Sequence, residues 1–201
     1  MDQGVTTDEE RPSADPSAPR ERVLAAAFIE FAVHGIAGAR IDRIAKAAKT
    51  SKERVYVYFR SKDEIYAAVI AEQIRVFLDA VTLDPHDIPR YVGELFDFNV
   101  AHPELMRLIA WSRLENTGPP SPEANDVLAA KVQAIGIAQA DGLIPDDIPA
   151  LDILILLTEL AGGWLSSTEF HVHAATGDSK AVAERRTAAV KIASRLFPPT
   201  R

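Results

Sequence analysis

Apolar residues recur at helical spacing along almost the whole chain, and no segment has the strict alternation typical of a β-strand. From residue 21 to residue 34 they lie three or four positions apart, and Gly35 follows as a helix stop. The same spacing predicts further helices over residues 62–81, 88–101, 103–116, 123–140, 150–175 and 179–197. The predicted fold class is therefore all-α, with about nine helices.

Two shorter helices are predicted between residues 40 and 59. The first has four apolar positions on one side, namely Ile41, Ile44, Ala45 and Ala48. A break at residues 49–51 separates it from a second helix, whose inward side carries Val55, Tyr58 and Phe59. Two short helices joined by a turn of this length are typical of a helix-turn-helix, in which the second helix lies in the major groove of DNA.

The side of the second helix opposite its inward residues is expected to face the groove, because successive residues are about 100° apart. This outward set consists of Lys52, Glu53, Arg54, Tyr56 and Val57. Thr50 and Glu53 also have the spacing of a capping box, in which a hydroxyl and a carboxylate both accept backbone N–H groups. Glu53 therefore has two candidate roles, as a partner in this cap or as an acceptor from a cytosine amino group.

A second capping box is predicted at Ser61 and Glu64, where the helix over residues 62–81 starts. It places Lys62 in the first turn, where backbone N–H groups and a lysine can together hold a DNA phosphate. This helix would join the DNA-reading segment to the rest of the chain, so a tilt of the helix would move the reader.

The distribution of charge agrees with a DNA-reading segment. Between residues 40 and 62 there are eight Lys or Arg and two acidic residues, whereas the whole chain has a formal net charge of −7. Residues 20–80 carry eleven basic and eight acidic residues, and residues 81–201 carry ten and sixteen. A basic face on a short helix is most often only a solvated surface. Its coincidence with the turn and two capping boxes favours a basic reader attached to an acidic body.

Two other stretches bear on the class of protein. Residues 1–19 contain three prolines and five acidic residues, which predicts a disordered tail rather than a signal peptide, and a cytoplasmic location is expected. The most apolar stretch, residues 151–165, is interrupted by Asp152, Glu159 and two glycines. A membrane span needs about 20 clear apolar residues, so a buried helix is predicted instead.

Positions from 35 to 62 resemble the signature of the TetR (tetracycline-repressor-like) family. The matching residues, in the family's order and close to its spacing, are Gly35, Ile44-Ala45, Ala48, Ser51, Tyr56, Tyr58-Phe59 and Ser61-Lys62. The resemblance covers roughly residues 20–80. It implies a dimeric, all-helical regulator, usually a repressor, that releases its operator when a small molecule binds the C-terminal domain.

The resemblance implies specific DNA contacts. They fall on Ser51, Lys52, Glu53, Arg54, Tyr56, Val57 and Lys62, with Thr50 of the cap and Arg40 as further candidates. Three departures stand out: Lys49 where the turn usually has Gly, Glu53 where Gly is common, and Ala39-Arg40 where a Thr is usual. Lys49 suits the turn if the turn avoids positive φ. Arg40 is expected to replace the phosphate contact of the missing threonine.

The predicted domains are a DNA-binding domain at residues 20–80, with its motif at about 40–59, and an effector-binding and dimerisation domain at residues 81–201. The helix over 150–175 has apolar residues on too many sides for one neighbour. With the amphipathic last helix it would form a four-helix bundle across a two-fold axis, as the family does, giving a homodimer through the last two helices. Two readers about 34 Å apart then match a palindrome.

The body is also a candidate small-molecule site, for an unknown effector. Bulky and polar residues proposed to line it are Phe98, His102, Trp111, Trp164, Phe170 and His171. Apolar walls with a few polar groups suit a ligand pocket, but the same residues would equally fill a helical core. Both interpretations remain open at the level of sequence.

No enzyme or metal site is predicted. His171 and His173 are two residues apart, on opposite sides of a helix, and neither a glycine-rich phosphate loop nor a nucleophile elbow is present. No cofactor is implied. The leading hypothesis is a ligand-released repressor that binds a palindromic operator as a homodimer. The alternative is a helical small-molecule-binding or scaffold protein with a non-functional DNA head, which Ala39, Lys49 and Glu53 favour.

Overall fold

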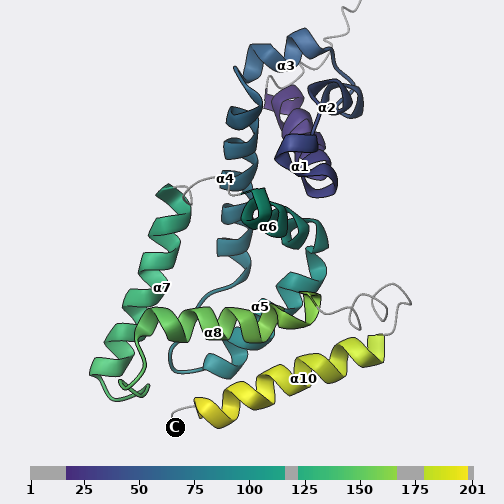
Figure 1. Cartoon of the computed structure of the whole chain (residues 1–201). Helices are drawn as coiled ribbons and strands as arrows, with labels where there is room; N and C mark the ends of the chain where they lie inside the picture. The colour runs from purple at the N-terminus through teal and green to yellow at the C-terminus, as the bar shows by residue number, and fades with distance from the viewer. Residues whose placement is uncertain (1–16, 116–121, 167–178, 199–201) are drawn as a thin grey trace, which may run out of the picture.

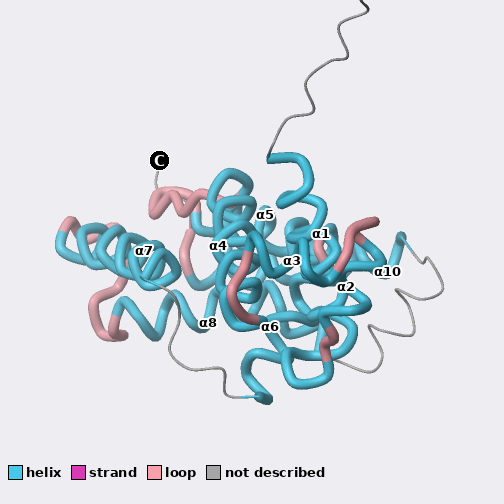
Figure 2. Tube along the Cα trace, turned by 90° about the horizontal axis from the view of Figure 1, so that it is seen from above, coloured by secondary structure: helices cyan, strands magenta, loops and turns pink. Residues whose placement is uncertain are grey.

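The computed structural model describes residues 17–115, 122–166 and 179–198, and every regular element in them is a helix (Figures 1 and 2). Their order is α1 (Ser17–Gly38), α2 (Ile41–Ala47), α3 (Lys52–Tyr58), α4 (Lys62–Ala80), α5 (Ile88–Ala101), α6 (Pro103–Glu115), α7 (Pro122–Ala140), α8 (Ala150–Gly162), the 3-10 helix η1 (Gly163–Ser166) and α10 (Ser179–Leu196). These nine α-helices and one short 3-10 helix in the described ranges confirm the all-α prediction. None of the helices described is both long and apolar enough to cross a bilayer.

Two predicted boundaries differ from the structure. Helix α1 begins at Ser17, inside the segment expected to be a tail; residues 1–16 lie outside the described residues. The single helix predicted over 150–175 is wrong, because α8 ends at Gly162 and the chain tightens into η1. The paired glycines at 162–163 explain the change, since glycine has poor helix propensity. Residues 167–178, and with them Phe170 and His171, lie outside the described part.

Helices α1, α2, α3 and the first turns of α4, here called the head, share one apolar core. Val23, Ala27 and Phe31 lie four residues apart on one face of α1 and are completely buried. The other helices contribute Ile44 from α2, Val55 from α3 and Ile65 from α4, each also fully buried. The core therefore fixes the angle between the two helices of the predicted motif.

A break in α1 marks the junction between the head and the remaining helices, here called the body. Gly35 has φ 67° and ψ 178°, so the helix is interrupted there, at the predicted stop, before a last turn to Gly38. Glu115, at the end of α6, accepts an N–H bond from Ile36 at 2.7 Å and longer ones from Ala37. A Cβ atom at position 35 would lie 2.4 Å from Glu115 Oε1 and 2.9 Å from the Trp111 ring. Glycine is thus required at position 35, because its φ is positive and because a Cβ atom would have no room there.

Helix α4 runs from the head into the body, where α5 lies at the centre (Figure 1). Helix α5 is capped by Asp87, whose side chain accepts the Arg90 N–H, and the helix packs against α6, α8 and α10. Gly93 allows α10 to approach closely, because an added Cβ would lie 3.2 Å from Val190 Cγ2. The body thus consists of helices laid around α5, far from α3.

Candidate nucleic-acid interface

Helix α3, the second helix of the predicted motif, begins at a serine cap. Ser51 is the N-cap residue, and its Oγ accepts an N–H bond from Arg54 at 3.2 Å. The prediction that Thr50 supplies the cap hydroxyl is wrong by one residue. Thr50 lies half-buried in the turn and its N–H binds Ala45 O at 3.0 Å. Because α3 starts at residue 52, only the hydroxyl at 51 reaches the third N–H of the helix.

The two sides of α3 are as predicted. Val55 and Phe59 are buried, at 0% and 2% exposure, and Tyr58 is partly buried. The predicted outward residues, Lys52, Glu53, Arg54, Tyr56 and Val57, are all exposed. Val57 is 79% exposed, so its apolar side chain has little packing role within the chain. The helix therefore presents a mixed basic, aromatic and apolar face on a fixed support.

The turn between α2 and α3 contains a left-handed residue. Lys49 has φ 54°, the one positive φ of a non-glycine residue in the described ranges. Lysine was expected to suit this turn only if the turn avoids positive φ. The turn does use positive φ, so this condition is not met. A lysine side chain in this region carries a steric cost that glycine avoids.

Charged groups around the start of α3 are paired. Lys52 Nζ lies 3.1 Å from Asp42 Oδ1 of α2, and the hydrogen bond that it donates to this carboxylate raises the pKa of Lys52. The Glu53 backbone N–H and the Ser51 hydroxyl lower the pKa of Glu53. Glu53 therefore carries its negative charge at the helix N-terminus, where the helix dipole favours it. The predicted capping box of Thr50 and Glu53 does not form, because Glu53 is the second helical residue, its carboxylate accepts its own N–H, and the Thr50 N–H binds Ala45 O.

The start of α2 depends on Glu30 of α1, a residue that the sequence did not single out. Arg40 is the N-cap of α2 and makes no side-chain cap bond. Glu30 Oε1 instead accepts the Arg40 N–H at 2.9 Å and Arg43 Nε at 2.7 Å. Burial acts to raise the pKa of Glu30, but the bonds from Arg43 and Arg40 outweigh it and lower this pKa. Arg43 is thus occupied within the head, whereas Arg40 remains exposed.

Lys62 points into the protein rather than away from it. Its Nζ donates to Ala37 O and Ala39 O, both at 3.3 Å, at the end of α1. The predicted cap at Ser61 is present, with Oγ accepting the Glu64 N–H at 3.1 Å. Glu64 accepts the N–H of Arg60 at 2.7 Å. The predicted phosphate contact of Lys62 would therefore compete with two carbonyl oxygens.

The structure brings only some of the predicted ligand residues together. Phe98 and His102 stack with ring centroids 4.2 Å apart, and Phe77 of α4 meets Phe98 edge-on at 5.2 Å. Trp111 lies instead against Gly35 in the head junction, and Trp164 lies on η1. Within the described residues, no three His, Asp or Glu side chains gather closely enough to hold a metal ion.

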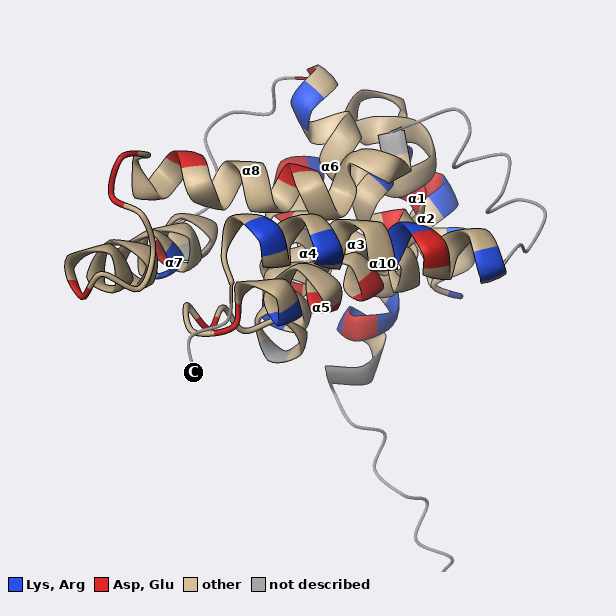
Figure 3. Cartoon of the chain, turned by 90° about the horizontal axis from the view of Figure 1, so that it is seen from below, with Lys and Arg blue, Asp and Glu red and all other residues tan. Residues whose placement is uncertain are grey.

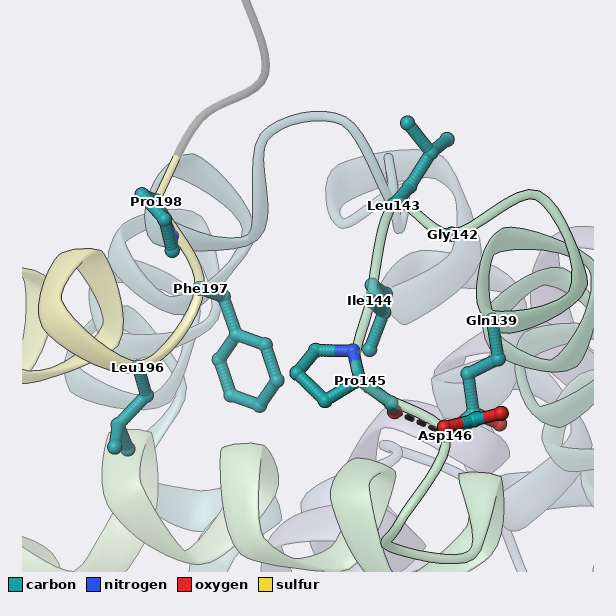
Figure 4. A pocket seen from close by; sticks show the side chains of 9 residues that line it. All are labelled: Gln139, Gly142, Leu143, Ile144, Pro145, Asp146, Leu196, Phe197 and Pro198. Atoms are coloured by element: carbon teal, nitrogen blue, oxygen red, sulfur yellow. Dashed lines mark hydrogen bonds between the residues drawn. The ribbon is translucent and has the colours of Figure 1, made fainter.

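A surface hollow of about 450 Å³ lies elsewhere in the body, between the α7–α8 turn and the end of α10 (Figure 4). Figure 4 shows Phe197 and Pro145 facing each other across it. Gln139 Nε2 fixes the turn by donating to Pro145 O at 2.7 Å and Ile148 O at 2.8 Å. None of the predicted ligand residues lines this hollow.

Comparison with known protein families matches both parts of the chain. The sequence model described as bacterial regulatory proteins, tetR family, matches residues 23–69. The model described as tetracyclin repressor-like, C-terminal domain, matches residues 87–195, more than half of the chain. These two ranges cover most of the head and most of the body.

Individual relatives agree with the family match. The HTH-type transcriptional repressor SCO4008 of Streptomyces coelicolor is 43% identical over 150 residues, which is 73% of this chain and 78% of the relative. The HTH-type transcriptional repressor NicS of Pseudomonas putida is 28% identical over 155 residues, covering 70% and 73%. The crystal structure of SCO4942 from Streptomyces coelicolor superposes with a TM-score of 0.80 at 43% identity, covering 90% of this chain and 99% of that one. This chain therefore belongs to the TetR family of helix-turn-helix, DNA-binding transcriptional regulators.

Proposed function

We propose that this protein is a repressor that binds a palindromic operator as a homodimer and releases it when a small molecule binds the body. The outward face of α3 carries the proposal. Lys52 and Arg54 provide charge, Tyr56 is 45% exposed, and the apolar Val57 suits contact with a thymine methyl group. Val55 on the other side of α3 is completely buried, which gives the face the rigid support that base reading requires.

The homodimer is supported by apolar side chains left exposed on two neighbouring helices. They are Leu151, Ile155 and Leu156 on α8, and Ile192 and Leu196 on α10, between 41% and 60% exposed. Between Asp152 and Glu159 helix α8 has no charged residue, and Figure 3 draws this stretch beside α10 on the underside of the molecule. Paired across a two-fold axis, the two helices would bury these residues in a four-helix bundle.

Release by a ligand is supported by two direct links between the body and the head. Helix α4 extends from the Ser61 cap in the head to Phe77 in the body. The Glu115 carboxylate of α6 holds the backbone of Ile36 and Ala37, just before α2. A ligand that favours one position of α4 or α6 would thereby change the spacing of the two α3 helices in a dimer.

The test is selection of bound genomic fragments by the purified protein, repeated with Lys52→Ala and Tyr56→Ala. A recovered palindrome should bind each variant about tenfold or more weakly, because phosphate and groove contacts of α3 are lost. Arg75→Ala is the matched control: it removes the same charge from an exposed residue of α4, which pairs with Glu72. Its affinity should stay within about twofold of the wild type.

One observation favours the alternative of a ligand-binding protein with a silent head. Lys52 is already paired with Asp42, and Lys62 with two carbonyl groups. Salt dependence separates the two functions, because operator binding releases counterions and weakens steeply as salt rises. No enriched fragment at moderate salt, from a folded dimer, would refute the repressor proposal and leave the alternative.

A further inference from the structure

Lys131 of α7 directs its ammonium group at aromatic rings from two other helices. Its Nζ lies 4.2 Å from the ring centroid of Phe77 on α4 and 5.0 Å from that of Tyr91 on α5. Nζ also donates a hydrogen bond to Tyr91 Oη at 3.3 Å. The side chain is partly buried, at the point where three helices meet.

This ammonium group has no carboxylate partner in the described ranges. No Asp or Glu oxygen there lies within 4.0 Å of Lys131 Nζ, whereas Arg90, Lys180 and Arg186 of the body pair with Glu94, Glu184 and Asp97. Aromatic faces and one phenol offset only part of the cost of removing a cation from water. Burial lowers the pKa of Lys131 to about 8, so the group is still mostly charged at neutral pH.

An incompletely covered apolar surface adjoins the lysine. Ile70, Ile74 and Phe77 lie on one face of α4, and all three are only partly buried. Beneath Phe77 lies the buried ring of Phe98, and the partly buried His102 stacks on that ring. One cation at the end of an apolar surface is the arrangement that an amphipathic acid requires.

We propose that Lys131 is the anion-binding residue of the effector site, and that the effector is an organic carboxylate with an apolar body. The carboxylate pairs with Lys131 Nζ, and the apolar part covers Ile70, Ile74 and Phe77. The inference rests on the proposed function, because it names the chemical class of the molecule that acts on the body.

A carboxylate fits this site better than a phosphate does. The Lys131 ammonium group is the donor available to a ligand, because Tyr91 is only 2% exposed, and its single positive charge matches the single negative charge of a carboxylate. Burial raises the pKa of Tyr91 to about 12, so its hydroxyl stays neutral and adds no second charge to the site. A dianionic phosphate would leave one negative charge unpaired beside apolar side chains, which is costly.

The experiment uses the full chain and two matched pairs of probes, octanoate with octanamide and phenylacetate with phenylacetamide. Binding is measured by thermal shift and calorimetry at pH 7 for the wild type, Lys131→Met and Lys131→Gln. Lys180→Met is the control, since it removes an exposed lysine of α10 that pairs with Glu184. Lys131→Gln keeps a polar side chain in case the methionine variant does not fold.

At least one carboxylate should stabilise the wild type and Lys180→Met, and its amide should bind about tenfold or more weakly. Both Lys131 variants should lose about tenfold or more in affinity for that carboxylate. The wild-type affinity should also fall as pH rises above 8, where the ammonium group loses its proton.

Equal binding of acid and amide, undiminished binding by the Lys131 variants, or no response to either carboxylate would overturn the inference. Operator binding by the ligand-free protein is measured separately. An intact operator response without Lys131-dependent carboxylate binding refutes only this inference. Lys131-dependent carboxylate binding without any operator refutes only the repressor proposal.

Discussion

At the scale of single residues, several side chains of the head occupy positions with a local energetic cost. Lys49 adopts φ 54°, where an L-residue other than Asn or Asp is disfavoured by roughly 1 kcal/mol. Arg40 caps α2 without a side-chain bond, and the Glu30 carboxylate of α1 accepts the N–H of Arg40 itself. Of the three departures from the family pattern, Lys49 is thus strained, whereas the backbone at Arg40 is held by Glu30.

Replacement of Lys49 by glycine should stabilise the protein. Lys49→Gly removes the left-handed strain at the cost of greater flexibility in the unfolded chain, so the free energy of unfolding should rise by about 0.5–1 kcal/mol. Urea denaturation measures the change. Lys46→Gly, which removes the same charge within α2, should instead lower stability by about 1 kcal/mol. A loss of stability in both variants would contradict the strained turn.

Lys131 should make stability depend on pH above neutrality. Burial lowers its pKa from 10.5 to about 8, so between these values the unfolded chain binds more protons than the folded one. Wild-type stability should therefore rise from pH 8 to pH 10 relative to Lys131→Met, by on the order of 1 kcal/mol after allowance for solvent screening. Denaturation of both proteins at several pH values measures it. Parallel pH profiles of the two proteins would show that folding does not lower the pKa of Lys131.

At the scale of elements, α3 combines a weak local sequence with strong external support. It has only seven residues, too few for a helix that is stable alone, so its cap and its packing decide whether it forms. Val55 and Phe59 provide the packing and Ser51 provides the cap. The outward residues contribute little to this support, so they are free to vary with the DNA sequence that we propose they read.

Removal of the cap hydroxyl tests which residue starts α3. Ser51→Ala should lower the free energy of unfolding by about 1 kcal/mol, because the Arg54 N–H loses its acceptor. Thr50→Ala should cost less, since its backbone N–H, not its side chain, binds Ala45 O. Chemical denaturation of the two variants gives the comparison. A larger loss for Thr50→Ala would restore the cap that the sequence alone predicts.

Helical periodicity was sufficient to predict which side of each short helix is buried. Successive residues of a helix are about 100° apart, so Val55 and Val57 lie on nearly opposite sides of α3. In the structure Val55 is buried and Val57 is exposed. The cap could not be assigned from sequence, because Thr50 and Ser51 are adjacent hydroxyl residues and differ only in register. Lys62 binds carbonyl groups 23 and 25 residues away, which no local pattern reveals.

At the scale of the whole molecule, the head and the body differ in how much of their structure could be predicted from the sequence. The motif of the head is local, so its fold and most of its outward face were predicted. The predicted ligand residues of the body come from several helices and do not all lie together in the structure. Phe98 and His102 are in contact, whereas Trp111 lies against Gly35 of the head. Lys131 gave no sequence signal, because a lone lysine on an amphipathic helix is normally a surface residue.

The predicted dimer can be tested by charges placed on its apolar faces. Leu156→Glu and Leu196→Glu, each at a 60% exposed position, should shift the protein to monomers at micromolar concentration in analytical ultracentrifugation. Operator affinity should also fall in these two variants, because a monomer presents only one α3 helix to the operator. Leu114→Glu is the control, because Leu114 is 77% exposed on α6, outside both helices of the interface. An unchanged dimer in the first two variants would place the interface elsewhere.

The contact between Gly35 and Glu115 limits how regulators of this kind can be recombined. A foreign head joined at residue 81 would meet Glu115 and Trp111 of this body, and any side chain at position 35 would collide with both. Exchange of residues 39–59 alone would leave the contact intact, because Ile36 and Ala37 keep their bonds to Glu115. For the design of hybrid sensors, the interchangeable cassette is therefore α2 with α3, or else the head together with α6.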